Sequence, residues 1–376
     1  MNALSLFANI GVAEAYLETI GVSVVVANEL IAKRAKLYSQ IYPNATMIQG
    51  DITEKSVYNE IVSQSLKNDV KIVIATPPCQ GMSTAGMKDI NDERNRLIIP
   101  TVNIIKSIKP EYVFLENVPG FMKTSIEVDD KWILIPEFIK KELGKEYIIN
   151  FYQVDVKNYS VPQTRERTIL LLTKRGIQKE WILPDKDKNI VTMQEAIGQL
   201  PTVDPFIKDI SEEELLSIFP KFYERKEMAL SISEWNNPPQ HIKRQVIAMM
   251  HTPTGKTAFD NVKYYPIKSD GKPVRGYRNT YKRQNWDTTA YTVTMDNVKI
   301  SSQNNVHPGR FIGFDESGEV LYSDPRVLTL YELMIIMSLP SSWPVPKNTS
   351  ESFLRRVIGE GIPPLFVKKV FENIIK

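Results

Sequence analysis

The residue most able to do covalent chemistry is Cys79, the only cysteine of the chain. It stands in the segment Ala75-Thr76-Pro77-Pro78-Cys79-Gln80-Gly81-Met82-Ser83. A lone cysteine is commonly a small buried hydrophobic residue. The two prolines before this one, and the glycine and serine after it, instead favour a rigid and exposed thiol. Such a thiol can act as a nucleophile.

Two further motifs carry groups that could assist a nucleophile. Glu116 ends an apolar run in Phe114-Leu115-Glu116-Asn117-Val118, and Arg165 and Arg167 stand in Gln163-Thr164-Arg165-Glu166-Arg167. A carboxyl group beside a thiolate can donate a proton to the reacting molecule. For the two arginines, a salt bridge or a solvated charge at the sheet edge is the alternative interpretation.

The elements that must position these groups form an α/β pattern. Continuous apolar runs predict strands at 4–8, 22–27, 46–49, 71–75 and 111–115. Helical spacing predicts a helix over 12–20 that Gly21 ends, and the runs 147–154 and 168–173 predict an antiparallel hairpin at the sheet edge. We therefore expect a doubly wound, mostly parallel sheet, with Cys79 and Glu116 facing one crevice at the carboxyl ends of its strands.

The turn after the first predicted strand, Phe7-Ala8-Asn9-Ile10-Gly11-Val12, is a candidate nucleotide-binding turn. In a doubly wound sheet, backbone amides at this position approach the ligand. Glu29 follows about twenty residues later, where a carboxylate can accept hydrogen bonds from ribose hydroxyls. Asp51 follows the third predicted strand. Each of these features alone is also common in an ordinary connection between a strand and the next element, where no ligand binds.

Beyond residue 176 the pattern becomes irregular and proline-rich, which predicts a second, smaller domain. We expect a first domain over 1–180 and 326–376 and the second over 181–325. In the second domain, five cations and no acidic residue occur between residues 271 and 286. This segment is either a solvated charged loop or a binding surface for a polyanion. Thr329 and Glu332 predict a capping box, and a last helix is expected after Pro364.

Composition excludes several classes of protein. The chain has 376 residues, with 47 Lys plus Arg against 44 Asp plus Glu, so its formal charge is +3. One cysteine allows neither an intrachain disulfide nor a cysteine-based zinc cluster. We find no secretory leader and no apolar run of about 18 residues that could span a bilayer. We expect a protein of the reducing cytoplasm.

Several of these motifs together resemble one family. FANIGV, ANEL, GDI, PPCQ, ENV, QTRER and IGEGIPP, in this order, are similar to the DNA (cytosine-5) methyltransferases of bacterial restriction-modification systems, over nearly the whole chain. The resemblance implies a Rossmann-like methyltransferase fold and a target-recognition domain. It also implies methyl transfer from S-adenosylmethionine to C5 of a cytosine flipped out of duplex DNA.

Two other functions fit the same scaffold. The first is an RNA cytosine methyltransferase acting on tRNA; Gly81-Met82-Ser83 disfavours it, because that branch usually has Pro-Phe-Thr after PPCQ. The second is a non-catalytic DNA-binding protein, which the presence of Cys79, Glu116 and Arg165 disfavours, because binding alone does not require a thiol.

The resemblance implies roles for the matching residues. Cys79 would add to cytosine C6, Glu116 would hydrogen-bond N3 and Arg165 would hold O2. The implied catalytic group is Cys79, Gln80, Glu116, Arg165 and Arg167. The implied cofactor contacts are Phe7, Asn9, Ile10, Gly11, Glu29, Leu30, Asp51, Ile52, Pro78, Leu97, Glu360 and Gly361. The implied DNA contacts are Ser83, Thr84, Lys272, Arg275, Arg278, Lys282 and Arg283. The resemblance implies no metal, a monomer, no membrane partner and a possible cognate endonuclease.

Some positions depart from the family pattern. Asn9 and Val12 stand where glycines are usual, and Glu360 replaces an asparagine. After Thr329, three places commonly held by Pro, Arg and Arg are taken by Leu330, Tyr331 and Ile335. These three substitutions predict that an ionic scaffold there is exchanged for an apolar one.

Overall fold

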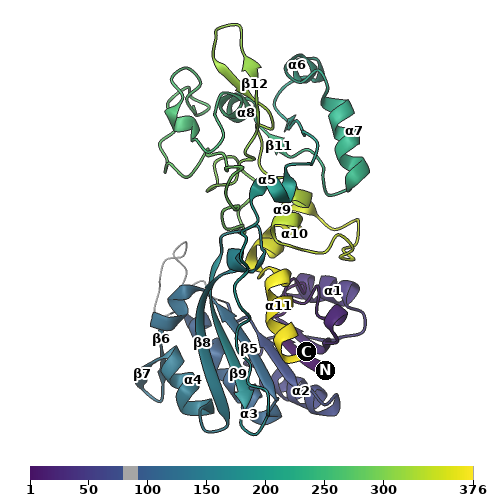
Figure 1. The fold of residues 1–376 in the computed structure, drawn as a ribbon, viewed down its shortest axis with the longest axis vertical. Helices are drawn as coiled ribbons and strands as arrows, with labels where there is room; N and C mark the ends of the chain where they lie inside the picture. The colour runs from purple at the N-terminus through teal and green to yellow at the C-terminus, as the bar shows by residue number, and fades with distance from the viewer. Residues whose placement is uncertain (79–91, 376) are drawn as a thin grey trace.

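The computed structural model describes residues 1–78 and 92–375. Its centre is a seven-stranded sheet in the order β3-β2-β1-β4-β5-β9-β8 (Figure 1). These strands are β1 (Asn2–Leu6), β2 (Ser23–Glu29), β3 (Thr46–Gln49), β4 (Ile72–Ala75), β5 (Tyr112–Asn117), β8 (Tyr147–Asp155) and β9 (Glu166–Lys174). β1 to β5 pair in parallel, and the strand order reverses at β1. The sheet is therefore doubly wound, as the sequence predicts.

Helices cover both faces of this sheet. They are α1 (Ala32–Ile41), α2 (Lys55–Lys67), α3 (Ile98–Ile108), α4 (Ile135–Leu143) and α11 (Pro364–Ile375), with short 3-10 turns at Glu18–Ile20, Glu93–Leu97, Pro119–Lys123 and Val156–Tyr159; α10 (Glu351–Glu360) lies beside the sheet, against the turn after β1. A small hairpin, β6 (Ser125–Val128) and β7 (Lys131–Leu134), precedes α4. Although α11 ends the described chain, it packs on the sheet built by the first half of the sequence.

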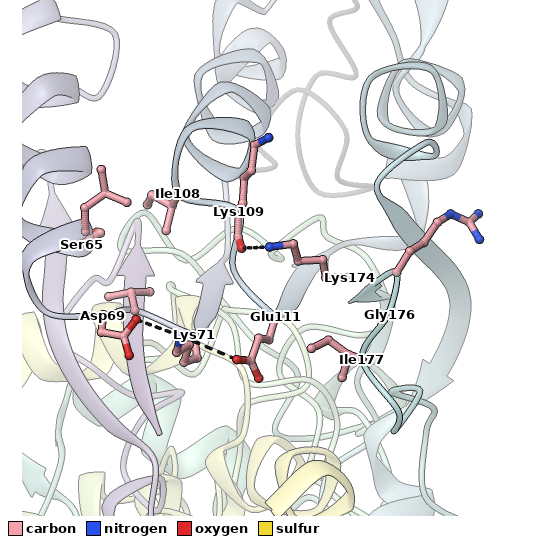
Figure 2. Close-up of a pocket in the computed structure, with 12 residues that line it drawn as sticks. Ser65, Asp69, Lys71, Ile108, Lys109, Glu111, Lys174, Gly176 and Ile177 are labelled. Carbon is pink, nitrogen blue, oxygen red and sulfur yellow. Dashed lines mark hydrogen bonds and ion pairs between the residues drawn. The ribbon is translucent and has the colours of Figure 1, made fainter.

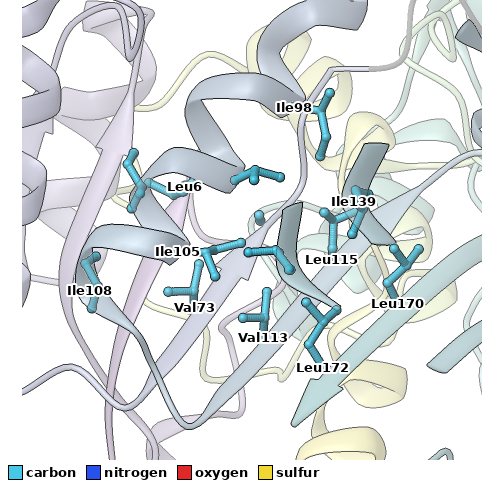
Figure 3. Packing of buried hydrophobic residues seen from close by; sticks show 14 of the residues in the cluster. Leu6, Val73, Ile98, Ile105, Ile108, Val113, Leu115, Ile139, Leu170 and Leu172 are labelled. Atoms are coloured by element: carbon cyan, nitrogen blue, oxygen red, sulfur yellow. The ribbon is translucent and has the colours of Figure 1, made fainter. Parts of the chain in front are cut away.

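Successive side chains of a strand point to opposite faces of the sheet, and this divides the core into two layers. On one face, buried residues of the strands pack against α3 and α4 (Figure 3); they include Leu6, Val73, Val113, Leu115, Leu170 and Leu172. On the other face, strand residues pack against α11 and Trp181; they include Ala3, Ile72, Ile74, Phe114, Ile169 and Leu171. Burial on both faces is the physical reason that these strands appear as continuous apolar runs in the sequence.

The predicted hairpin is confirmed. β9 pairs antiparallel with both β5 and β8, and β8 forms the sheet edge. The connection between β8 and β9 holds only one 3-10 turn, which is too short for the crossover helix that a parallel pair needs.

The helix predicted over 12–20 is wrong. The segment forms successive turns with hydrogen bonds to the third preceding residue, such as Ala15 N to Val12 O, and ends in the 3-10 turn Glu18–Ile20. In an α-helix the Gly11 carbonyl would accept from the Ala15 amide. Here it accepts from the Glu14 amide at 3.3 Å and from the Tyr42 hydroxyl at 2.5 Å. A turn bond and a tertiary contact together take the place of the helical bond that the spacing predicted.

A second, less regular part of the chain follows the sheet and lies above it in Figure 1. Its elements are α5 (Met193–Ile197), β10 (Phe206–Ile207), α6 (Glu212–Ile218), α7 (Phe222–Ile232), β11 (Gln240–His241), α8 (Lys243–Met250), the 3-10 turn Ala258–Asp260, β12 (Phe311–Phe314) and β13 (Val320–Tyr322). We call residues 188–329 the second body. Trp181 and Leu183 still pack in the core of the sheet. The sheet part therefore continues past the expected boundary at residue 180.

The two parts meet at α9 (Leu330–Ile336) and α10. The capping box at Thr329 and Glu332 is present and begins α9 as predicted. A buried apolar cluster joins residues of the first turn, α1, α5, α9 and α10; it includes Ile10, Leu37, Met193, Leu333 and Ile358. The return of the chain through α9 and α10 therefore connects the second body to the sheet by apolar packing.

Candidate active site

The carboxyl ends of β1 and β4 lie side by side at the point where the strand order reverses. Thr76 Oγ1 donates to the carbonyl of Phe7 at 3.3 Å, which ties the two segments that leave these strands. Asn117 Nδ2, at the end of β5, donates to the carbonyl of Pro77 at 3.1 Å. The chain just before Cys79 is thus fixed to both neighbouring strands. Cys79, Gln80, Ser83 and Thr84 themselves lie outside the described residues.

Glu116 is paired at the same edge of the sheet. Arg167 Nε lies 2.6 Å from Glu116 Oε1, and the two side chains are only 12% and 13% exposed. The pair spans β5 and β9, whose antiparallel register places Glu116 opposite Ile169. A guanidinium with a fixed direction can hold a carboxyl group in one orientation while leaving its second oxygen for another partner.

The expected contact of Arg165 with a base must be corrected. Arg165 is 2% exposed, and its guanidinium donates to the carbonyls of Val293 at 2.8 Å and Gly361 at 2.7 Å. It also donates to the carbonyl of Gly359 at 3.0 Å. The side chain lies in the junction between the sheet and the second body, and its Nη1 and Nη2 groups donate to these backbone carbonyls. The alternation of the strand does not govern this residue, because β9 begins only at Glu166.

Gln163 has a similar place in the junction. It is fully buried, accepts from the amide of Val293 at 3.0 Å and donates to the sulfur of Met337 at 3.1 Å. The motif Gln-Thr-Arg-Glu-Arg therefore divides into a first half that joins the two parts of the molecule and a last arginine that faces Glu116. The sequence does not predict this division, because spacing alone does not distinguish the roles of Arg165 and Arg167.

The turn after β1 is held by side chains from elements distant in sequence. Glu29 Oε2 accepts from the amide of Asn9 at 2.8 Å, while its Oε1 accepts from the amide of Ile31 at 2.9 Å. Asn9 Nδ2 donates to the carbonyl of Val357 at 3.0 Å. Asn9 adopts φ 52°, a left-handed conformation that asparagine tolerates better than most residues. The turn is thus fixed between β2 and α10.

The other expected cofactor residues have different surroundings. Ile10 and Ile52 are buried in apolar clusters, and Leu97 packs against the core of the sheet, so their side chains serve packing. Leu30 is exposed, and Asp51 accepts from the amide and hydroxyl of Thr53.

The C-terminal positions close the same region. A side chain at Gly361 would come within 2.7 Å of Val12, so glycine allows the close approach of α10 to the turn. Glu360 pairs with Arg34 at 2.7 Å and faces Arg356 at 3.7 Å. The extra carboxylate is therefore largely compensated by cations of the chain itself.

The basic segment is only partly available to a ligand. Arg283, one of the expected DNA contacts, is 0% exposed and donates to the carbonyls of His307, Asp324 and Met249. That expectation is wrong, because its charge serves the interior of the second body.

The other cations of the segment lie nearer the surface. Arg278 forms an ion pair with Asp260, and Lys282 lies over the ring of Tyr291. Lys272 and Arg275 are exposed.

The ionic scaffold expected to be lost is present. Arg326, also 0% exposed, pairs with Asp324 and Glu332 at 2.8 Å each. His307 lies 3.6 Å from Glu332, and burial lowers the pKa of His307 to about 4, so its imidazole is neutral at pH 7. We call Arg283, His307, Asp324, Arg326 and Glu332 the ionic cluster. The prediction that an apolar scaffold replaces an ionic one is wrong, because Arg326 supplies the charge from outside α9.

A cavity of about 480 Å³ lies at the other end of the sheet (Figure 2). It is lined near the amino ends of β4 and β5, where Lys71 pairs with Asp69 at 2.8 Å and Lys174 donates to the carbonyl of Lys109. This cavity is therefore separate from the edge that carries Glu116. Among residues 1–78 and 92–375, we find no helix able to cross a membrane and no cluster of three or more potential metal ligands.

The doubly wound sheet, with a carboxyl and a guanidinium fixed beside the proline-flanked segment before Cys79, defines a Rossmann-like methyltransferase. A model of the C-5 cytosine-specific DNA methylases matches residues 1–376. The chain belongs to this family.

Two relatives agree with this assignment, and one solved structure shares the fold. The chain is 41% identical to the Type II methyltransferase M1.HgaI of Avibacterium volantium, over 99% of this chain and 97% of that one. It is 26% identical to M.DdeI of Desulfomicrobium norvegicum, over 100% and 88% of the two chains. A solved E. coli structure assigned as a prophage-encoded DNA modification methyltransferase shares the fold, with a TM-score of 0.68, 18% identity and coverage of 100% and 98%. The protein therefore methylates C5 of cytosine in DNA, and S-adenosylmethionine is the methyl donor of its family.

Proposed function

We propose that methylation proceeds by covalent addition of Cys79 to a flipped cytosine, with Glu116 and Arg167 as the groups that hold the base. The observation that carries this proposal is the Glu116–Arg167 pair at the edge next to the segment before Cys79. Cytosine C5 is a weak nucleophile. A thiolate bond to C6 would move the electron pair of the C5–C6 bond toward C5 and so activate it.

Glu116 would control the charge that this addition creates. With Oε1 held by Arg167, its other oxygen would carry a proton to cytosine N3 as electron density builds on the ring. Arg167, in place of Arg165, would reach toward O2 of the base. After methyl transfer, removal of the C5 proton and expulsion of the Cys79 thiolate would restore the aromatic ring. We assign that proton to no residue.

The turn from Phe7 to Val12 fits S-adenosylmethionine as its ligand. Asn9 Oδ1 is buried and has no hydrogen-bond partner among the described residues, so it can accept from a ligand donor. Glu29 and Asp51 end neighbouring strands and could accept from the ribose and the adenine. Phe7 and Pro78 would flank the ligand across the β1–β4 switch point. The bound cofactor supplies an electrophilic methyl group on a sulfonium.

We further propose that the second body reads a specific duplex sequence, with the exposed Lys272 and Arg275 contacting phosphates. Flipping the target base costs a few kcal/mol, which contacts in the crevice must offset. A cognate restriction endonuclease would cut the same sequence when it is unmethylated, and the bacterial cytoplasm is the expected place of action. We expect the enzyme to act as a monomer.

A mechanism-based trap tests the covalent step. Sequencing DNA from expressing cells for 5-methylcytosine first identifies the site, and a duplex with 5-fluorocytosine at that site is then incubated with enzyme and cofactor. Fluorine cannot leave as a proton does, so the adduct should persist, and peptide mass spectrometry should find it on Cys79. Cys79→Ala should bind the duplex but form no adduct and no product. Normal turnover by this variant, or methylation by wild type without any trapped adduct, would overturn the proposal.

One alanine variant of each arginine distinguishes the roles of Arg165 and Arg167. Arg167→Ala should lower kcat by about 100-fold or more with little change in melting temperature, since it removes a donor from the reacting site. Arg165→Ala should instead destabilise the fold, because it removes donors to three buried carbonyls. If Arg165→Ala were stable but inactive and Arg167→Ala active, our assignment would be reversed. Methyl transfer from labelled cofactor to tRNA in place of duplex DNA would contradict the assigned substrate.

A further inference from the structure

The turn proposed to bind the cofactor packs against a partly buried tyrosine. Tyr42 follows α1, and its hydroxyl donates to the carbonyl of Gly11 at 2.5 Å. Its ring lies directly against Gly11, where an added Cβ would come within 2.0 Å of Tyr42 Cε2. Gly11 has φ 82°, so both the backbone conformation and the ring require glycine there.

Tyr42 is itself held in place. Trp343, from the segment after α9, donates through Nε1 to the Tyr42 hydroxyl at 3.1 Å. The ring of Tyr38, one helical turn earlier, lies 4.9 Å from that of Tyr42. The hydroxyl therefore has one donor and one acceptor partner in fixed directions, and burial raises its pKa far above the usual value. It remains a neutral donor at any working pH.

A second contact holds the segment that follows the turn. The Tyr38 hydroxyl donates to the buried carboxyl group of Glu14. With Glu29 holding the Asn9 amide, side chains of β2, α1 and the residue after α1 contact residues 9–14 at three points. Because residues 12–20 do not form the predicted helix, these contacts help to determine the backbone shape of residues 9–14.

We infer that Tyr42 is a positioning residue for the cofactor: its hydroxyl fixes the Gly11 peptide so that the turn binds S-adenosylmethionine without further ordering. This inference rests on the proposed cofactor site at residues 7–12. A loop ordered before binding loses less conformational entropy when the ligand arrives, which gives tighter binding without any new contact. Tyr42 itself lies beneath the turn and would not touch the ligand.

The test uses the full chain carrying Tyr42→Phe, which keeps the ring and removes only the hydroxyl. Loss of the hydrogen bond to the Gly11 carbonyl should lower the affinity for the cofactor about fivefold to tenfold. Titration calorimetry should show that the dissociation constants for S-adenosylmethionine and S-adenosylhomocysteine rise by this factor. Without ligand, the amides of residues 11–15 should exchange with solvent faster than in wild type. The KM for the cofactor should rise while kcat and the KM for DNA stay unchanged.

Tyr147→Phe is the matched control. Tyr147 is a buried tyrosine whose hydroxyl donates to a backbone carbonyl, that of Pro110, at 2.9 Å, and it lies at the amino end of the sheet. This variant should show any general cost of losing such a bond with no change in cofactor affinity. If Tyr42→Phe does not fold, Trp343→Phe should show a smaller loss of cofactor affinity in the same direction.

Two further variants distinguish a failure of the Tyr42 inference from a failure of the proposed cofactor site. Glu29→Ala should weaken cofactor binding whatever Tyr42 does. If Glu29→Ala weakens binding and Tyr42→Phe binds like wild type, Tyr42 has no positioning role, even if amide exchange becomes faster. If Glu29→Ala and Asn9→Ala also bind like wild type, the proposed cofactor site itself is wrong.

Discussion

The sheet and the second body are stabilised in different ways. The sheet buries two continuous apolar layers between its helices, and its strands contribute to both of them. Apart from its share of the apolar cluster at the junction, the second body has small apolar clusters, such as the one around Met249 and Tyr281, and it also buries charges of the ionic cluster. Apolar packing tolerates many combinations of side chains, whereas a buried charge requires each of its partners.

The burial of charged residues is harder to predict from the sequence than the position of a strand. In the sheet, an apolar run correctly predicts a strand. In the second body, Arg283 was expected at the surface, yet Arg283 and Arg326 are both completely buried. Backbone carbonyls and carboxylates surround them, and some of these partners come from segments far apart in the sequence, such as Met249 for Arg283 and Val203 for Arg326.

The largest loss of stability is expected for Arg326→Met. This change leaves Asp324 and Glu332 buried without their guanidinium partner, and breaking such a pair costs about 3 to 5 kcal/mol. Urea unfolding followed by circular dichroism would measure the change. Arg275→Met, at an exposed cation of the same body, is the control and should stay within about 0.5 kcal/mol. A loss below about 1 kcal/mol for Arg326→Met would mean that the ionic cluster contributes little.

A somewhat smaller loss is expected in the sheet for Leu172→Ala. Leu172 is 1% exposed and belongs to the layer under α3 and α4, so the cavity left behind should cost about 3 kcal/mol. The same unfolding experiment applies, with the exposed Leu66→Ala as control. Equal losses for the two leucines would contradict the two-layer core.

Glu14→Gln tests the buried acid next to the sheet. Burial raises the pKa of Glu14 to about 7, against 4.5 for the ordinary group, so the folded state holds the proton more tightly than the unfolded one. The contribution of the protonated Glu14 side chain to the free energy of unfolding is complete below pH 4.5 and is lost as pH rises through 7. Glutamine still accepts from Tyr38 but does not ionise. The variant should therefore match wild type near pH 5 and exceed its stability by about 2 kcal/mol at pH 8. Parallel unfolding curves at both pH values would argue against this pKa.

The smallest effect on stability is expected for Lys272→Ala with Arg275→Ala. Both residues are exposed, so the free energy of unfolding should change by less than about 0.5 kcal/mol. If both contact phosphates, the slope of log affinity for duplex DNA against log salt should become less steep by up to about two units. Arg283→Met should show the opposite pattern, a clear loss of stability. An unchanged salt slope in the double variant would mean that this segment faces away from DNA.

Much of the catalytic edge could be predicted from the sequence. Runs of apolar residues locate β1, β2, β3, β4 and β5, and the residues just after such strands must gather at one edge. Glu116 and the turn at Phe7 were found in this way. The roles of Arg165 and Arg167 could not be separated, because the start of β9 decides which of them faces Glu116 and which enters the junction.

The sequence by itself determined the sheet, its antiparallel edge, the start of α9 and the family of the enzyme. These features depend on local patterns of burial and hydrogen bonding, which the order of residues expresses directly. Only the tertiary structure decided that residues 12–20 form turns and that Arg165, Arg283 and Arg326 lie inside. Each of these outcomes depends on a partner more than twenty residues away, such as Tyr42 for Gly11 or Val293 for Arg165, and no local pattern contains that partner.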